Sequence, residues 1–211
     1  MRNYATEFVG TFFLVLTIGL TALAGAPLAP LAIGAALMVM VYMGGHVSGG
    51  HYNPAVSLAV LLRGKLAPRE FVPYVVAQVA GSLAASAAVS WILGATFGPS
   101  PGQGTSTAGA LLVEILYTFA LCLVVLNVAT SSKTQGNSYY GLAIGFTITV
   151  GALAGGPVSG GAFNPAVGIG PLVWGALIGG GSLAHLWLYV VGPLLGGGLA
   201  AALFRVQEGR A

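Results

Sequence analysis

The chain has 211 residues, of which 56% are hydrophobic and only 5% are charged, and its mean hydropathy is +0.92. A water-soluble domain carries about 25% charged residues, so this composition excludes an ordinary cytosolic enzyme. The net charge of +3 comes from too few groups to form a nucleic-acid-binding surface. The single cysteine, Cys122, excludes an internal disulfide and a cysteine metal cluster. An all-α membrane protein is the class that remains.

Six apolar stretches are long enough to cross a bilayer, because a helical crossing needs about 20 residues. The predicted spans cover residues 6–25, 31–48, 70–93, 109–129, 138–156 and 183–204. The first is predicted to be a retained helix rather than a signal peptide, because Glu7 lies inside it and no small-residue cleavage site follows. Short connections rich in turn residues join the spans, so we predict one membrane domain over residues 1–211.

The basic residues indicate an orientation. With the N-terminus inside and six crossings, every Lys and Arg falls on the inner side: Arg2, Arg63, Lys65, Arg69, Lys133, Arg205 and Arg210. Cytoplasmic connections carry an excess of Lys and Arg, so both termini are predicted to be cytoplasmic. The Ala- and Gly-rich, short-looped chain favours an integral protein of a bacterial inner membrane.

Two further apolar stretches, Asn53 to Leu62 and Asn164 to about Trp174, are too short to cross. Ten helical residues reach about 15 Å, half a bilayer, so we predict two re-entrant half-helices. Each begins with Asn-Pro-Ala. Asn is a favoured helix N-cap, and Pro fits the first helical position. Two helix N-termini that meet at the midplane add their positive ends there, which disfavours cations.

The two halves of the chain resemble each other. Residues 48–56 match residues 159–167 at seven of nine positions, and residues 7–12 resemble residues 114–119. Each half therefore holds three spans and one half-span. Because three crossings are an odd number, the second half is predicted to be inverted relative to the first. The repeats cover approximately residues 1–104 and 105–211.

The paired triplets, the inverted repeat and the Glu-x-x-x-Thr-Phe start of each half resemble the aquaporin, or major intrinsic protein, family. The resemblance covers essentially the whole chain. It implies six tilted helices and two half-helices, with one pore per subunit of a homotetramer. Its pore motif corresponds to residues Asn53, Pro54, Ala55, Asn164, Pro165 and Ala166. We expect no catalytic residue, cofactor, metal or nucleic-acid partner.

One departure from the family bears on selectivity. In most members an Arg directly follows the second triplet, and here that residue is Val167. Gapless spacing from the two Asn residues places the other filter positions on Ile33, Ala152 and Gly161, and Pro157 keeps its expected place between the fifth span and the loop. This quartet is small and apolar. We therefore predict a wide, passive channel for water and small uncharged solutes: glycerol, urea, ammonia, hydrogen peroxide or neutral metalloid hydroxides.

Two other functions stay open. A water-selective channel would result if an aromatic group such as Phe163 or Tyr42 narrowed the mouth. A coupled secondary transporter would need a coupling-ion site or a carboxylate pair in the path, although Asp is absent and the chain has only four Glu.

Four polar residues are candidates for supporting roles. Glu7 and Glu114 lie near membrane depth, where an ionisable group is a functional hypothesis by default. They act either as proton-coupled sites or, as the resemblance implies, as acceptors for the backbone of the loop that holds each half-helix. His51 is expected to hydrogen-bond the loop, with pH gating as the alternative. Gln78 is expected to be a buried packing link.

Overall fold

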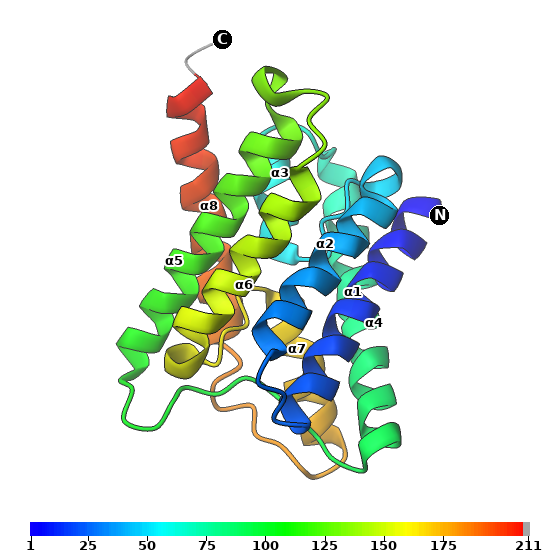
Figure 1. Ribbon diagram of the computed structural model, residues 1–211, viewed down its shortest axis with the longest axis vertical. Helices are drawn as coiled ribbons and strands as arrows, with labels where there is room; N and C mark the ends of the chain where they lie inside the picture. The colour runs from blue at the N-terminus through cyan, green and yellow to red at the C-terminus, as the bar shows by residue number, and fades with distance from the viewer. Residues whose placement is uncertain (209–211) are drawn as a thin grey trace.

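The computed structural model describes residues 1–208 as a bundle of helices (Figure 1). In chain order the α-helices are α1 (Arg2–Leu23), α2 (Ala29–Ser48), α3 (Pro54–Leu62), α4 (Pro68–Leu93), α5 (Thr107–Val125), α6 (Tyr140–Ser159), α7 (Pro165–Leu177) and α8 (Leu188–Glu208). A π-helical turn, Leu126–Thr130, continues α5, and a 3-10 turn, Ser132–Thr134, follows it.

Six of these helices are long and apolar enough to cross a membrane: α1, α2, α4, α5 with its π-helical turn, α6 and α8. The other two, α3 and α7, have 9 and 13 residues. The prediction of six long helices and two half-helices is therefore confirmed.

Some predicted boundaries are wrong. The helix α1 begins at Arg2 instead of residue 6, and α8 begins at Leu188 instead of residue 183. Before α8 the chain forms turns, with the Leu188 N–H donating to the His185 carbonyl at 3.0 Å. Pro157 lies inside α6 and not after it. Apolar content locates a span, but backbone hydrogen bonds decide where its helix starts and stops.

The helices of the two halves pack in equivalent pairs. The helix α1 packs on α4, and α5 packs on α8 in the same way, while α2 packs on α6 between the halves. Each half-helix also contacts a long helix of the other half, α7 on α4 and α3 on α8. Figure 1 shows α7 in the interior, behind α2 and α6. The two halves are thereby interlocked around the half-helices.

Glycines allow the paired helices to approach closely. A Cβ atom added to Gly34 of α2 would lie 2.6 Å from the Gly145 carbonyl oxygen of α6. A Cβ atom at Gly192 would lie 2.8 Å from the Glu114 Cβ atom on α5. Small residues are the usual means of close helix contact in lipid. Gly34, Gly145 and Gly192 therefore serve helix contacts within the chain.

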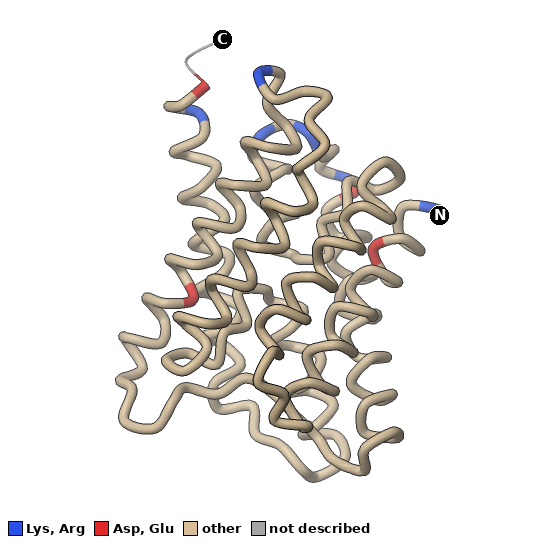
Figure 2. The backbone as a smooth tube through the Cα atoms, viewed as in Figure 1, with Lys and Arg blue, Asp and Glu red and all other residues tan. Residues whose placement is uncertain are grey.

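Charge separates the two ends of the bundle. Figure 2 shows the described Lys and Arg residues at the end where α1 begins and α8 ends, here called the basic end. Arg210, which the orientation argument also used, lies outside the described residues. The connections 24–28, 94–106 and 178–187 contain no Lys, Arg, Asp or Glu. They form the opposite end, here called the neutral end.

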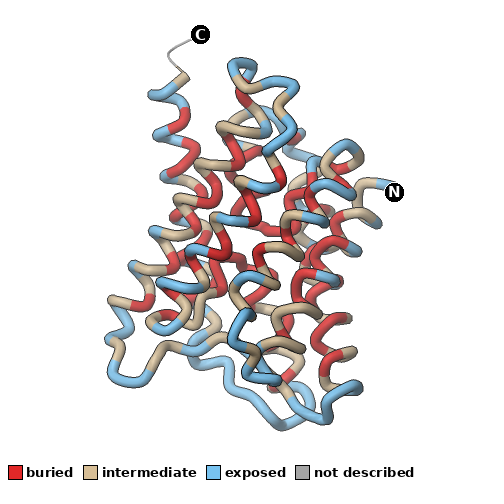
Figure 3. The backbone as a smooth tube through the Cα atoms, viewed as in Figure 1, coloured by how far each residue is buried: buried red, intermediate tan, exposed pale blue. Residues whose placement is uncertain are grey.

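The lateral surface of the bundle is apolar. Large hydrophobic side chains are exposed on several helices, among them Val76, Leu153 and Leu199 at 54–61% exposure. Buried residues line the inward faces of the same helices (Figure 3). In water this surface would be unfavourable, whereas hydrocarbon chains cover it without cost.

The glycine run in α8 offers a matched pair of substitutions. A Cβ atom at Gly196 would lie 2.5 Å from the Ile115 carbonyl oxygen and 2.8 Å from the Phe119 nitrogen, whereas one at Gly198 would meet nothing within 4 Å. Gly196→Ala is therefore expected to lower the free energy of unfolding by about 1–3 kcal/mol, because α8 must move off α5. Thermal unfolding of the purified protein in detergent, followed by size-exclusion fluorescence, measures the change.

Gly198→Ala is the control. It is expected to keep or raise the unfolding temperature, because Ala is the better helix former. Equal losses in the two variants would contradict a backbone contact between α5 and α8 at Gly196.

Candidate pore

Two reverse turns connect long helices to half-helices. The helices α2 and α6 end at glycines in the left-handed region, Gly49 with φ of 92° and Gly160 with φ of 91°. Tyr52 and Phe163 follow in the same turns with φ of 50°, which is uncommon for residues other than glycine. Such a conformation costs on the order of 1–3 kcal/mol and needs surrounding contacts to hold it. Each turn must therefore be supported from outside itself.

Glu7 of α1 supports the first turn. Its Oε1 atom accepts hydrogen bonds from the Ser48 hydroxyl at 2.6 Å and the His51 N–H at 3.0 Å. Its Oε2 atom accepts from the Tyr52 N–H at 2.7 Å. The Glu7 side chain is fully buried. Its carboxylate therefore satisfies backbone donors of the turn and fixes the strained residue.

Glu114 of α5 does the same for the second turn. Its Oε1 atom accepts from the Ser159 hydroxyl at 2.7 Å and the Ala162 N–H at 3.0 Å, and its Oε2 atom accepts from the Phe163 N–H at 2.7 Å. This side chain is also fully buried. The two carboxylates thus occupy equivalent positions in the two halves.

Two tyrosines, not identified from the sequence, reinforce the turns. The Tyr74 hydroxyl donates to the Ser48 carbonyl at 2.8 Å, and the Tyr189 hydroxyl donates to the Ser159 carbonyl at 2.6 Å. Both carbonyls end a helix, where no intrahelical donor is available. The sequence contains a signal for this pair. Tyr74 precedes Gly81 on α4 by the same number of residues as Tyr189 precedes Gly196 on α8.

The two predicted N-cap residues meet at the centre. Asn53 Oδ1 accepts from the Ala55 N–H at 2.8 Å, and Asn164 Oδ1 accepts from the Ala166 N–H at 2.9 Å, so each caps its half-helix. Asn53 Nδ2 donates to the Phe163 carbonyl and Asn164 Nδ2 donates to the Tyr52 carbonyl, each at 2.9 Å. Each asparagine therefore also ties its own turn to the turn of the other half.

The half-helices begin with the expected proline. Pro54 and Pro165 are the first residues of α3 and α7, and Ala55 and Ala166 follow, both fully buried. The Ser82 hydroxyl of α4 donates to the Ala166 carbonyl at 2.7 Å. The N-termini of α3 and α7 thus face each other in the interior, and the positive ends of both helix dipoles meet there.

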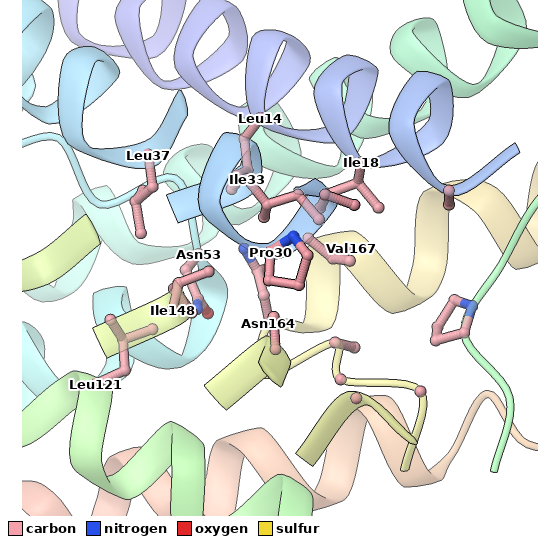
Figure 4. Close-up of a pocket in the computed structure, with 18 of the residues that line it drawn as sticks. Leu14, Ile18, Pro30, Ile33, Leu37, Asn53, Leu121, Ile148, Asn164 and Val167 are labelled. Atoms are coloured by element: carbon pink, nitrogen blue, oxygen red, sulfur yellow. The ribbon is translucent and has the colours of Figure 1, made fainter. Parts of the chain in front are cut away.

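A cavity of about 310 Å³ passes this centre and is shown in Figure 4. Its wall includes both asparagines and all four predicted filter residues: Asn53, Asn164, Ile33, Ala152, Gly161 and Val167. Figure 4 labels Ile33, Val167 and the two asparagines among the residues that line this cavity. The cavity lining within the described chain contains no Lys, Arg, Asp or Glu.

His51 and Gln78 belong to one polar network behind the wall. The His51 Nδ1 atom lies 3.0 Å from the Ser57 hydroxyl. Gln78 Nε2 donates to Ser57 Oγ at 2.9 Å and to Glu7 Oε2 at 2.8 Å. Of these residues His51 lines the cavity, whereas Gln78 and Glu7 do not. The network therefore connects the carboxylate that supports the first turn to the cavity wall.

The aromatic residues named as alternatives do not narrow the cavity. Phe163 is fully buried, with its ring against Tyr117, because the turn points it away from the centre. Tyr42 lies toward the basic end, where its hydroxyl donates to the Ser138 carbonyl at 3.1 Å. Neither residue lines the cavity, whereas Phe97 of the α4–α5 connection does. An irregular connection gives no periodicity from which this placement could be predicted.

Comparisons with known proteins identify the family of the chain. The sequence profile described as "Major intrinsic protein" matches residues 1–204. "Glycerol uptake facilitator protein-like 6" of Lactiplantibacillus plantarum is 39% identical over 98% of each chain. "Aquaporin NIP1-4" of Oryza sativa subsp. japonica is 40% identical over all of this chain and 79% of its own.

A solved structure shares the fold. The aquaglyceroporin from Plasmodium falciparum superposes with a TM-score of 0.86 at 24% identity, covering 96% of this chain and 94% of its own. Six long apolar helices around an interior cavity define an integral membrane protein of the channel class. The chain belongs to the major intrinsic protein family, whose members are membrane channels and not enzymes.

The equivalence of the two turns predicts a strong effect at Glu114. Glu114→Gln replaces one of the two acceptor oxygens by an NH₂ group, which is a donor. The Ser159 hydroxyl and the Phe163 N–H that face this side chain are also donors, so one of them loses its acceptor. We expect the free energy of unfolding to fall by about 1–3 kcal/mol, since a buried donor loses its acceptor. Thermal unfolding in detergent measures the loss.

Glu70→Gln is the matched control. Glu70 accepts a hydrogen bond from the Tyr4 hydroxyl and lies 3.8 Å from the exposed Arg69, outside the turns. Its substitution is expected to change the free energy of unfolding by less than about 1 kcal/mol. If Glu114→Gln were as stable as the native chain, the carboxylate would not be what holds the second turn.

Proposed function

We propose that the chain is a passive channel for water and small uncharged solutes such as glycerol, urea, ammonia, hydrogen peroxide and neutral metalloid hydroxides. The observation that carries the proposal is the shared cavity, in which Asn53 and Asn164 lie together with a small, apolar quartet. The name of the Lactiplantibacillus plantarum relative supports glycerol among these solutes.

The two asparagines are proposed as the central hydrogen-bond donors. Each Nδ2 atom carries two hydrogens, of which one is used between the turns. The second hydrogen is available to the oxygen of a water or hydroxyl in the cavity. Donors at the midplane turn the oxygen of each passing water toward the centre. The facing helix dipoles raise the energy of any cation at the same point, so protons and metal cations are disfavoured.

The quartet Ile33, Ala152, Gly161 and Val167 is proposed as the selectivity filter. These side chains provide no charge and no donor in place of the usual Arg. A wider solute therefore meets no long side chain that would block its passage. It also breaks no hydrogen bonds that such a side chain would otherwise make. The cavity of about 310 Å³ has room for several water molecules along its length.

A coupled transporter is not favoured. Such a protein needs a coupling-ion site or a carboxylate pair in the solute path. Glu7 and Glu114 accept hydrogen bonds from the turns and lie outside the cavity wall. Glu208 lies at the basic end, where its Oε1 atom accepts from the Ser131 hydroxyl at 2.7 Å.

We propose one channel domain over residues 1–211, built from inverted repeats at approximately 1–104 and 105–211. Equivalent helix pairing in the two halves supports this division. The family resemblance supports a homotetramer. The charge pattern supports a basic end in the cytoplasm, with both termini there, and the chain's composition favours a bacterial inner membrane.

Flux through proteoliposomes tests the filter. Stopped-flow light scattering with sucrose and then glycerol as the osmolyte is expected to show fast entry of water and of glycerol. Val167→Arg is expected to slow glycerol about tenfold while water still passes, because a long charged side chain enters the cavity. Ala95→Arg adds the same charge to an exposed residue at the neutral end and is expected to leave both rates unchanged. Native vesicles that pass water but exclude glycerol would refute the wide filter.

Cysteine labelling tests the orientation. The native Cys122 is fully buried, so the maleimide is not expected to label it. Lys65→Cys at the basic end and Gln103→Cys at the neutral end each introduce an exposed thiol. A membrane-impermeant maleimide added to intact cells is expected to label only Gln103→Cys, and Lys65→Cys only after permeabilisation. The reverse pattern would place the basic end outside.

A further inference from the structure

The neutral end of the cavity is bordered by a connection, residues 94–106, and not only by helices. Phe97, Gly98 and Pro99 of this connection line the cavity together with Pro30 and Val167. Among the described residues that line it, Phe97 is the one Phe, Tyr or Trp. The largest aromatic surface at this mouth therefore comes from outside the predicted quartet.

The connection is fixed on both sides of this segment. The Thr96 hydroxyl donates to the Gly180 carbonyl at 3.2 Å, and the Gly102 N–H donates to the Val158 carbonyl at 2.9 Å. Between these bonds the chain passes directly over the second turn, since a Cβ atom at Gly160 would lie 2.6 Å from the Ser100 nitrogen. The backbone on both sides of Phe97 is thus held in place by contacts with other parts of the chain.

The Phe97 ring packs against α1 at Gly19. A Cβ atom at Gly19 would lie 2.6 Å from the ring's Cε1 atom and 2.7 Å from Val89 Cγ2, so glycine leaves the space that the ring occupies. The residue is only half-buried, because it also borders the cavity. Gly98 packs next to it, where a Cβ atom would lie 2.8 Å from Leu172 Cδ2 of α7.

We propose that Phe97 sets the upper size limit for solutes at the neutral end of the pore. This inference rests on the proposed channel function, and it assigns the limit on solute size to one side chain. Phe97 supplies the one Phe, Tyr or Trp ring in the described cavity lining, and that rigid ring is held between α1 and the connection. Removal of the ring widens the mouth without adding a charge or a hydrogen-bonding group.

A series of side-chain sizes at this position tests the proposal. Proteoliposomes with the native chain, Phe97→Ala, Phe97→Leu and Phe97→Trp are challenged with urea, glycerol, erythritol and xylitol by stopped-flow light scattering. The erythritol-to-glycerol permeability ratio is expected to rise about tenfold in Phe97→Ala, to take an intermediate value in Phe97→Leu and to fall in Phe97→Trp. Water permeability per reconstituted protein confirms that each variant is folded.

Trp91→Ala is the matched control. Trp91 is an aromatic residue of α4 near the same end, is 89% exposed and does not line the cavity. Its substitution is expected to leave the permeability ratio unchanged. Should Phe97→Ala fail to fold, Phe97→Leu and Phe97→Trp still supply two sizes on either side of the native ring.

The outcomes separate this inference from the proposed function. A permeability ratio within about twofold of the native value in all folded Phe97 variants overturns the role of Phe97, even if glycerol passes the native channel. Native vesicles that exclude glycerol refute the wide filter. If Phe97→Ala then admits glycerol, Phe97 still sets the limit, at a smaller solute than proposed; if no variant admits it, both proposals fail.

Discussion

A reverse turn inside a bilayer exposes backbone N–H groups that lipid cannot satisfy, and each unsatisfied group costs on the order of several kcal/mol. In this chain Glu7 and Glu114 meet that requirement, each with two backbone N–H donors and one serine hydroxyl on its carboxylate. The half-helices can begin in the interior only because these acceptors lie on neighbouring long helices. The central asparagines, the cavity wall and the pairing of the halves all follow from the two turns.

The asparagines illustrate how one side chain can cap a helix and join two turns. An N-cap fixes the amide orientation through its Oδ1 atom, and the bond from Nδ2 to the opposite turn fixes it a second time. An amide held at both ends presents its remaining hydrogen in a constant direction. A group held in place in this way loses little conformational entropy when it donates to a passing oxygen atom.

Much of this architecture could be predicted from residue patterns, and some could not. Hydropathy located six spans, and the Asn-Pro-Ala triplets located both half-helix starts, because N-cap chemistry is local. The positive φ of Tyr52 and Phe163 could not be predicted, since it depends on carboxylates distant in sequence. Phe97 could not be predicted either, because it lies in an irregular connection whose path is decided by tertiary contacts.

The chain belongs to a family of membrane channels, and its cavity passes the point where the N-termini of α3 and α7 face each other. A passage that binds no coupling ion and consumes no energy obeys microscopic reversibility, so any constriction in it slows entry and exit by the same factor. Such a protein cannot accumulate a solute. Net uptake through it would require a cellular reaction that removes the solute after entry, and reversal of the gradient would turn the same molecule into an exit route.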